Sequence, residues 1–80
     1  MGEYELGLEL RRMYDTAPKG NQALAIHLFG IRFNKELSNN KLNKKAILRA
    51  ANLPESYHSE ISKGQKMGQY VSIQSDVVWY

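Results

Sequence analysis

The chain has 80 residues, no cysteine and a formal net charge of +3. A chain of this length forms one domain with a small core, and without cysteine it has neither disulfides nor thiolate metal sites to stabilise it. Its first residues lack the charged-then-apolar pattern of a leader, and no apolar run approaches the roughly 20 residues of a membrane span. We therefore expect a single soluble, cytoplasmic domain, 1–80, with no membrane partner.

The charges are unevenly distributed along the chain. Residues 1–15 carry −2, residues 16–66 carry +6, and the tail carries −1 through Asp76. A basic segment behind an acidic first helix indicates a polyanionic partner for the middle of the chain. A solvated basic surface is the other explanation, and the charge alone does not separate the two.

Two helices are predicted in the first half. Leu6, Leu10 and Met13 form an apolar stripe at helical spacing, and the helix that carries them should end at residues 17–20, where a proline and a glycine interrupt it. A second helix should begin after Asn21 as its cap and continue to about Ser38. It is apolar nearly all round, which is typical of a central helix with neighbours on several sides.

Two shorter helices should follow and meet at a tight corner. Asn43 is the expected N-cap of a helix over residues 44–51, and Asn52 should adopt the left-handed conformation in the turn. A fourth helix should run from Glu55 to about Lys63 and stop at Gly64, a residue suited to a left-handed C-terminal position.

The C-terminal segment alternates in the manner of β-strands. Residues 70–73 and 77–80 are β-prone and flank a turn, so a β-hairpin is predicted over 69–80. An isolated two-stranded hairpin is marginal, so this one must pack on the helices or join a partner chain. We therefore expect a homodimer through the first helix and the C-terminal strands.

The corner carries a family resemblance. Residues 51–64 read ANLPESYHSEISKG. This stretch resembles the helix-turn-helix of phage-repressor and Cro-like proteins, which reads Ala-Gly-Val-Ser-x-Ser-Tyr-Ile-Ser-x-Ile-x-x-Gly, and the match extends over residues 43–66. The whole chain is also similar to small bacterial helix-turn-helix-like proteins. Together with the predicted elements, this resemblance indicates a mostly α, winged-helix-like domain of about four helices with a C-terminal β-hairpin.

The chain departs from this family pattern at three places. Leu48 stands where the family has a small alanine, so the two helices should cross more widely. His58 stands where an aliphatic residue packs, and the chain turns to β-prone residues after Gly64 instead of adding two further helices.

The resemblance implies a recognition helix over residues 55–63 that enters the major groove of DNA. The residues nearest the bases would be Pro54, Glu55, Ser56 and Ser59. Those nearest the phosphates would be Lys44, Lys45, Lys63 and Lys66. The expected partner is double-stranded DNA and the expected role that of a small transcriptional regulator. The alternative is a protein–protein interaction module on the same scaffold without direct DNA contact, which Glu55, Glu60 and His58 favour.

The chain shows no catalytic pattern. Serines lie near His58, but neither an oxyanion loop nor an orienting acid accompanies them, so we expect no enzyme. His27 and His58 lack metal-ligand spacing. His27 is expected to be a satisfied core histidine, and His58 to pack at the corner with one nitrogen bonded or to act as a pH-dependent switch. No cofactor, metal or small-molecule substrate is expected.

Overall fold

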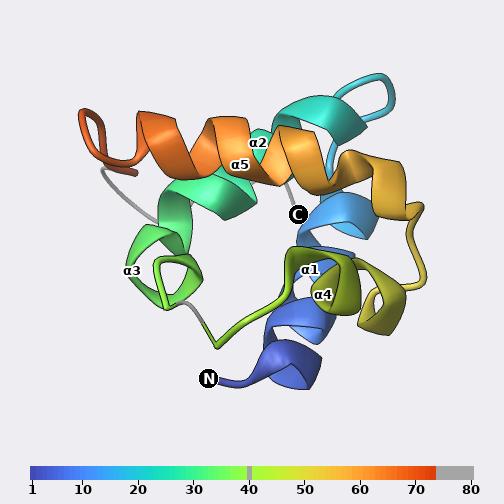
Figure 1. Ribbon diagram of the computed structural model, residues 1–80. Helices are drawn as coiled ribbons and strands as arrows, with labels where there is room; N and C mark the ends of the chain where they lie inside the picture. Colours follow the sequence, from blue (N-terminus) through green and yellow to red (C-terminus); the bar gives the residue numbers. More distant parts are fainter. Residues whose placement is uncertain (40, 74–80) are drawn as a thin grey trace.

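The structure is a computed structural model that describes residues 1–39 and 41–73, and over these residues the chain is helical (Figure 1). The elements, in chain order, are α1 (Glu3–Thr16), α2 (Gln22–Arg32), α3 (Asn34–Leu37), α4 (Lys44–Ala50), the 3₁₀ turn η1 (Glu55–Tyr57) and α5 (His58–Met67). Within the described ranges, no helix is long and apolar enough to cross a membrane.

The first helix follows the prediction. Leu6, Leu10 and Met13 are buried on one face of α1, and the helix ends just before Pro18. The Glu5 carboxylate accepts a hydrogen bond from the Gly2 N–H at 2.9 Å and so satisfies one of the backbone donors that a helix start leaves unpaired. The apolar stripe and the hydrogen bond at its N-terminus are enough to explain why α1 forms.

The predicted second helix is interrupted. It was expected to run to Ser38, but α2 ends at Arg32 and the short α3 follows after Phe33, which leaves the helical conformation at φ −105° and ψ 27°. The change of direction lets both Phe33 and Leu37 enter the core. Asn21 precedes α2 as expected, but its side chain makes no capping hydrogen bond.

The helices pack in two principal pairs, α1 with α4 and α2 with α5, and the two pairs lie against each other (Figure 1). Glycines allow both pairs to approach closely. A Cβ on Gly7 of α1 would lie 2.5 Å from the Ala50 Cβ of α4. A Cβ on Gly64 of α5 would lie 2.3 Å from the His27 carbonyl oxygen of α2, and one on Gly30 would lie 2.6 Å from the Ile61 carbonyl oxygen. Each glycine permits a helix crossing that a larger residue would push apart.

Gly64 therefore has a different role from the predicted one. It lies inside α5, which continues to Met67, so the prediction of a helix stop at this position is wrong. Its φ is not in the left-handed region; among the described residues only Asn52 and Gly20 have such angles. Close contact with α2, rather than backbone conformation, requires glycine here.

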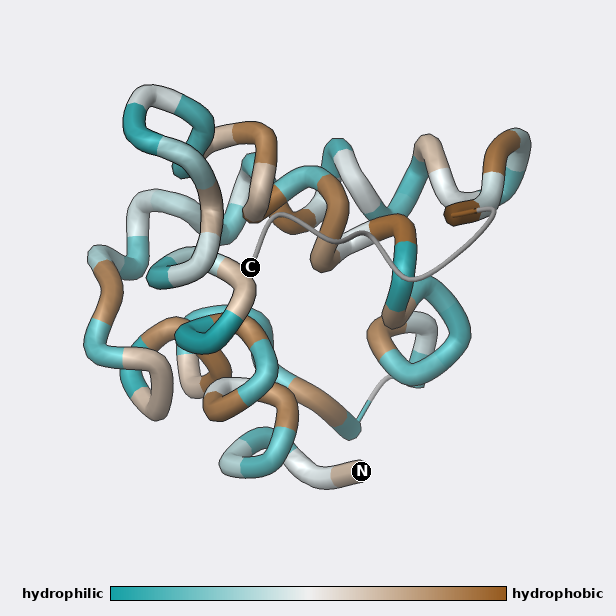
Figure 2. The backbone as a smooth tube through the Cα atoms, turned by 180° about the vertical axis from the view of Figure 1, so that it is seen from behind, coloured by the Kyte–Doolittle hydropathy of each residue, from teal (hydrophilic) through white to brown (hydrophobic). Residues whose placement is uncertain are grey.

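One apolar cluster joins all five helices. Figure 2 shows hydrophobic positions alternating with hydrophilic ones along the helical segments. The Phe29 and Phe33 rings lie 5.1 Å apart at a tilted angle in this cluster. Its fully buried large side chains are Leu6, Leu10, Ile26, Phe29, Ile47, Leu48 and Ile61.

The predicted C-terminal β-hairpin is wrong over the residues of it that the structure describes. No strand occurs in the described part of the chain, so neither the first predicted strand, 70–73, nor a winged-helix wing is present there. The N–H groups of Tyr70 and Val71 instead donate to the Met67 carbonyl at 2.9 and 3.0 Å, which closes the end of α5 as a turn. Tyr70 and Val71 are β-prone, but a strand also needs a paired neighbour. The second predicted strand, 77–80, lies outside the described residues.

Candidate nucleic-acid interface

The corner between α4 and α5 has the predicted backbone. Asn52 lies in the left-handed region at φ 57°, and the Leu53 N–H donates to the Leu48 carbonyl at 2.9 Å. Leu53 and Ile61 both turn into the core. The Arg11 guanidinium of α1 donates to the carbonyls of Ala51 and Asn52 at 3.3 and 3.4 Å, so the first helix supports the corner from behind.

The first turn of α4 is fixed by two caps. The Asn43 side chain accepts hydrogen bonds from the N–H groups of Lys45 at 2.8 Å and Ala46 at 3.3 Å, as predicted for an N-cap. The Glu3 carboxylate of α1 accepts from the Asn43 N–H at 2.6 Å. The backbone that carries Lys44 and Lys45 is thus held from both sides. Asn43 was predictable from sequence, whereas the contact with Glu3 requires the tertiary fold.

The fourth helix begins later than predicted. Pro54 has an extended ψ of 135°, residues 55–57 form the 3₁₀ turn η1, and α5 starts only at His58. Pro54, Glu55 and Ser56 are all exposed, but they precede the α-helix instead of forming its first turn. The Glu55 carboxylate lies 3.3 Å from the Arg49 guanidinium, so a cation of α4 offsets the negative charge at this edge.

Tyr57 ends the 3₁₀ turn and packs against the apolar cluster. The electrostatic influence of the neighbouring Tyr14 raises the pKa of Tyr57 above its ordinary value, and burial adds to the effect.

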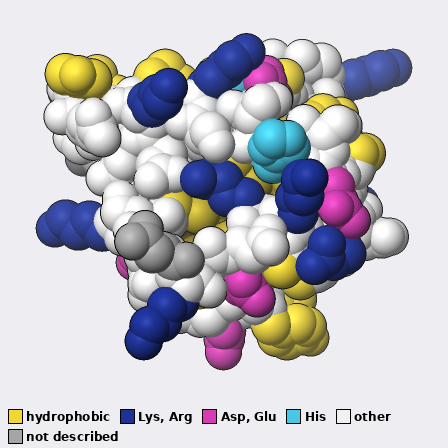
Figure 3. Space-filling model, in the orientation of Figure 1, with side chains coloured by type: hydrophobic (Ala, Val, Ile, Leu, Met, Phe, Trp, Pro, Cys, Tyr) yellow, Lys and Arg dark blue, Asp and Glu magenta, His cyan; other side chains and the backbone are white. Residues whose placement is uncertain are grey.

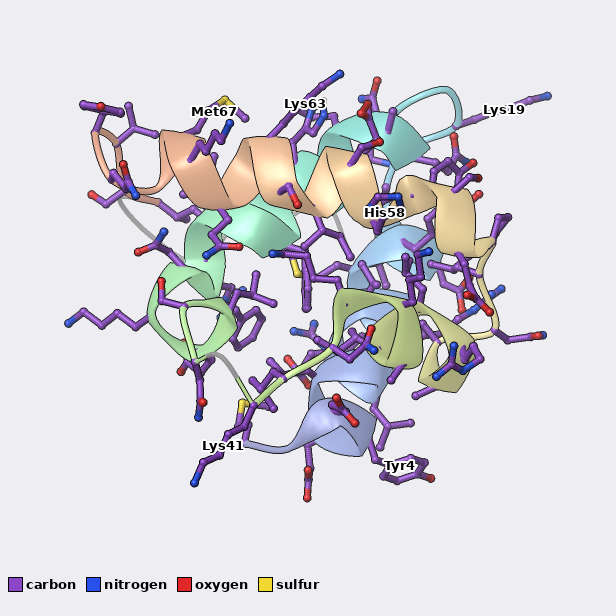
Figure 4. The ribbon with its side chains drawn as sticks, in the orientation of Figure 1. Tyr4, Lys19, Lys41, His58, Lys63 and Met67 are labelled. Carbon is purple, nitrogen blue, oxygen red and sulfur yellow. The ribbon has the colours of Figure 1, made fainter. Side chains whose placement is uncertain are left out.

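The outer face of α5 carries the remaining predicted residues. Ser59, Lys63 and Lys66 are exposed along one side of the helix, whereas Ile61 and Gly64 face α2. Figure 4 shows Lys63 extending outward from α5. The structure thus brings Ser59, Lys63 and Lys66 together on one face and leaves Pro54, Glu55 and Ser56 on the adjoining turn.

One charged network links α5 to α2. Glu60 lies between two partners, the Lys63 ammonium at 3.1 Å and the His27 Nε2 at 3.4 Å. The hydrogen bond from Lys63 is the main cause that lowers the pKa of Glu60. His27 Nε2 is buried and lies 3.4 Å from the Glu60 carboxylate without forming a well-aligned hydrogen bond, so the prediction of a satisfied histidine is wrong. Glu60 therefore steadies Lys63 and tethers α5 to α2.

His58 does not pack into the corner. It is exposed at the first turn of α5, where the resemblance implied a buried aliphatic residue, while Leu48 is completely buried. Sequence reasoning also left Lys41 and Ser62 unassigned, although both lie near Lys44 and Lys45 in the fold. Their proximity depends on how residues 41–43 lie against α5, which no local pattern indicates. Among residues 1–39 and 41–73, no cluster of three or more acidic or histidine side chains offers a metal site.

The corner, its two flanking helices and the polar outer face of the second define a helix-turn-helix-like domain. Comparison with known families agrees, because residues 3–74 match a family described as an HTH-like domain. The chain belongs to this family, a membership consistent with DNA binding. The match does not extend to the narrower phage-repressor and Cro-like group. No curated protein and no solved structure matches the chain.

Proposed function

We propose that the protein binds double-stranded DNA as a small transcriptional regulator, with the outer face of α5 toward the major groove. The observation that carries this proposal is the left-handed corner at Asn52, which fixes α5 so that Ser59, Lys63 and Lys66 share one exposed face. Serine hydroxyls can bond to bases or phosphates, and lysines supply the salt-dependent attraction to the DNA backbone.

The charges near this face also support DNA as the partner. Lys44 and Lys45 project from the capped first turn of α4, on the same side of the corner as His58 and Ser62. The acids nearby are neutralised, Glu55 by Arg49 and Glu60 by Lys63. No arginine lies on the described α5, so the commonest bidentate contact with guanine is missing. Contacts with the DNA backbone therefore dominate binding, and the preference for particular base sequences is modest.

The test is an electrophoretic shift assay on duplex DNA over a range of salt concentrations. The double variant Lys63→Ala/Lys66→Ala should weaken binding to all sequences alike and reduce the salt slope by about 2. The matched control removes two exposed lysines elsewhere, Lys19 in the α1–α2 loop and Lys35 on α3. An equal loss in the control would show that only net charge matters. No binding by the parent at low salt would refute DNA binding altogether.

The alternative, a protein–protein interaction module, has one observation in its favour. Several large apolar side chains are exposed, and two pairs of them are close together along the chain: Tyr4 (66%) and Leu8 (49%) one turn apart on α1, and Tyr70 (85%) and Val71 (53%) after α5. Soluble monomers generally keep such groups dispersed. The α1 pair fits the proposal of a homodimer through the first helix. Sedimentation of the parent and of Tyr4→Ser/Leu8→Ser distinguishes a dimer from a monomer.

A further inference from the structure

An open groove lies between the start of α4 and the start of α5, beside the outer face of α5. It is lined by Lys41, Leu42, Asn43, Lys44, Lys45, His58 and Ser62. Three of these side chains are lysines, one is a histidine and none is acidic. Figure 3 shows lysine and arginine side chains on both sides of the exposed histidine, and Figure 4 shows His58 on the first turn of α5, above α4.

The lysines of the groove are available to a ligand. In the described part of the chain, no carboxylate lies within 4 Å of the ammonium groups of Lys41, Lys44 or Lys45, in contrast to Lys63, which is paired with Glu60. The backbone beneath them is held by the Asn43 cap and by Glu3. Because this backbone is already ordered, only the lysine side chains lose freedom when an anion binds in the groove.

His58 lies among basic and polar groups in the groove. The loop and α4 bring Lys41, Lys44 and Lys45, and α5 itself contributes the hydroxyl of Ser62. Of the acids on the neighbouring elements, Glu55 of η1 pairs with Arg49 and Glu60 of α5 pairs with Lys63, whereas Glu3 of α1 accepts from the Asn43 N–H at the edge of the groove. A phosphate bound in the groove would place a negative charge beside the imidazole and so favour its protonated form.

We propose that this groove binds a phosphate of the nucleic-acid backbone and that His58 takes up a proton when it does so, which makes DNA affinity dependent on pH. The proposal rests on the proposed DNA-binding function and adds a second contact, apart from the outer face of α5. Histidine is the side chain whose charge ordinarily changes between pH 5 and pH 8. Since proton uptake and phosphate binding are reciprocally coupled, DNA should bind more tightly as the pH falls.

The experiment measures the dissociation constant for a duplex DNA fragment at pH 6 and pH 8, at equal ionic strength. The parent should bind about fivefold more tightly at pH 6, below the hundredfold limit that uptake of one full proton over two pH units allows. His58→Gln should lose the dependence on pH, so that its dissociation constants at pH 6 and pH 8 agree. Because His58 is exposed, this variant should keep the melting temperature of the parent.

The matched control is His27→Gln, which changes the chain's other histidine, on α2 beside Glu60. It should retain the pH dependence of the parent. If the parent binds DNA but His58→Gln keeps the full pH dependence, or if His27→Gln abolishes it, the groove proposal is overturned and DNA binding stands. If the parent binds no DNA at pH 6 and low salt, both proposals fail.

Discussion

The contact between α2 and α5 depends on Gly64, and replacing this residue by alanine tests it directly. The new Cβ would lie 2.3 Å from the His27 carbonyl oxygen, about 1.1 Å inside the 3.4 Å at which ordinary contact begins. It would also lie 3.0 Å from the Gly30 Cα. Both obstacles are backbone atoms inside a helix, so they cannot rotate away as the end of a side chain would. The two helices must separate.

Two effects of opposite sign determine the magnitude. Alanine in place of glycine inside a helix ordinarily gains about 1 kcal/mol. Overpacking of a tight contact costs about 1–3 kcal/mol and occasionally more, and a rigid backbone obstacle places Gly64→Ala at or above the upper end of that range. The net loss should be about 2 kcal/mol in the free energy of unfolding. For a domain of this size that corresponds to a melting temperature about 8–16 °C lower.

Thermal unfolding followed by circular dichroism measures this change. Ser59→Ala is the matched control, because Ser59 lies on the same helix but on its exposed face, where alanine should leave the melting temperature unchanged or slightly raised. A Gly64→Ala protein that melts at or above the temperature of the parent would refute the close crossing of α2 and α5.

Three further changes test the corner and its supports. Asn52→Gly should melt like the parent, whereas Asn52→Val should lose about 1–3 kcal/mol, because a β-branched residue is strained at φ 57°; equal melting temperatures would contradict a left-handed corner. Asn43→Ala should cost about 1 kcal/mol through loss of the α4 cap, and urea unfolding would disprove the cap if the midpoint did not move. Glu60→Gln should lower the melting temperature at pH 7 but not near pH 3. The lowered pKa of Glu60 stabilises the fold above the ordinary glutamate range, and this stability disappears as the pH falls through the folded-state pKa. A destabilisation equal at both pH values would show that the charge of Glu60 is unimportant.

Sequence reasoning succeeded where a local rule decides the structure. The stripe on α1, the cap at Asn43 and the left-handed Asn52 each depend on residues within a few positions of one another. The interruption between α2 and α3 at Phe33 has no local sequence signal, since neither proline nor glycine occupies this position. It is accompanied by a tertiary contact, in which the Asn34 amide donates to the Gln65 carbonyl at 2.5 Å.

The remaining errors also have non-local causes. A glycine can end a helix or permit a close crossing, and for Gly64 the choice depends on His27, which is distant in sequence. Of the candidate site, the lysines and serines were predictable by type and spacing, and they remain proposals as DNA contacts. The groove at His58 was not predictable, because the family resemblance implies an aliphatic residue that packs at this position.

The two helix pairs interleave along the chain, since α1 packs on α4 and α2 packs on α5. A nascent chain that has emerged only as far as α3 therefore exposes the apolar faces of α1 and α2 before their main partners, α4 and α5, have emerged. Both principal helix pairs join segments that are distant in sequence, so this helical domain should fold more slowly than an up-and-down helical hairpin of equal length. For the same reason, residues 43–66 excised alone would leave Ile47 and Ile61 without the helices that cover them, and a fragment of that kind should not fold independently.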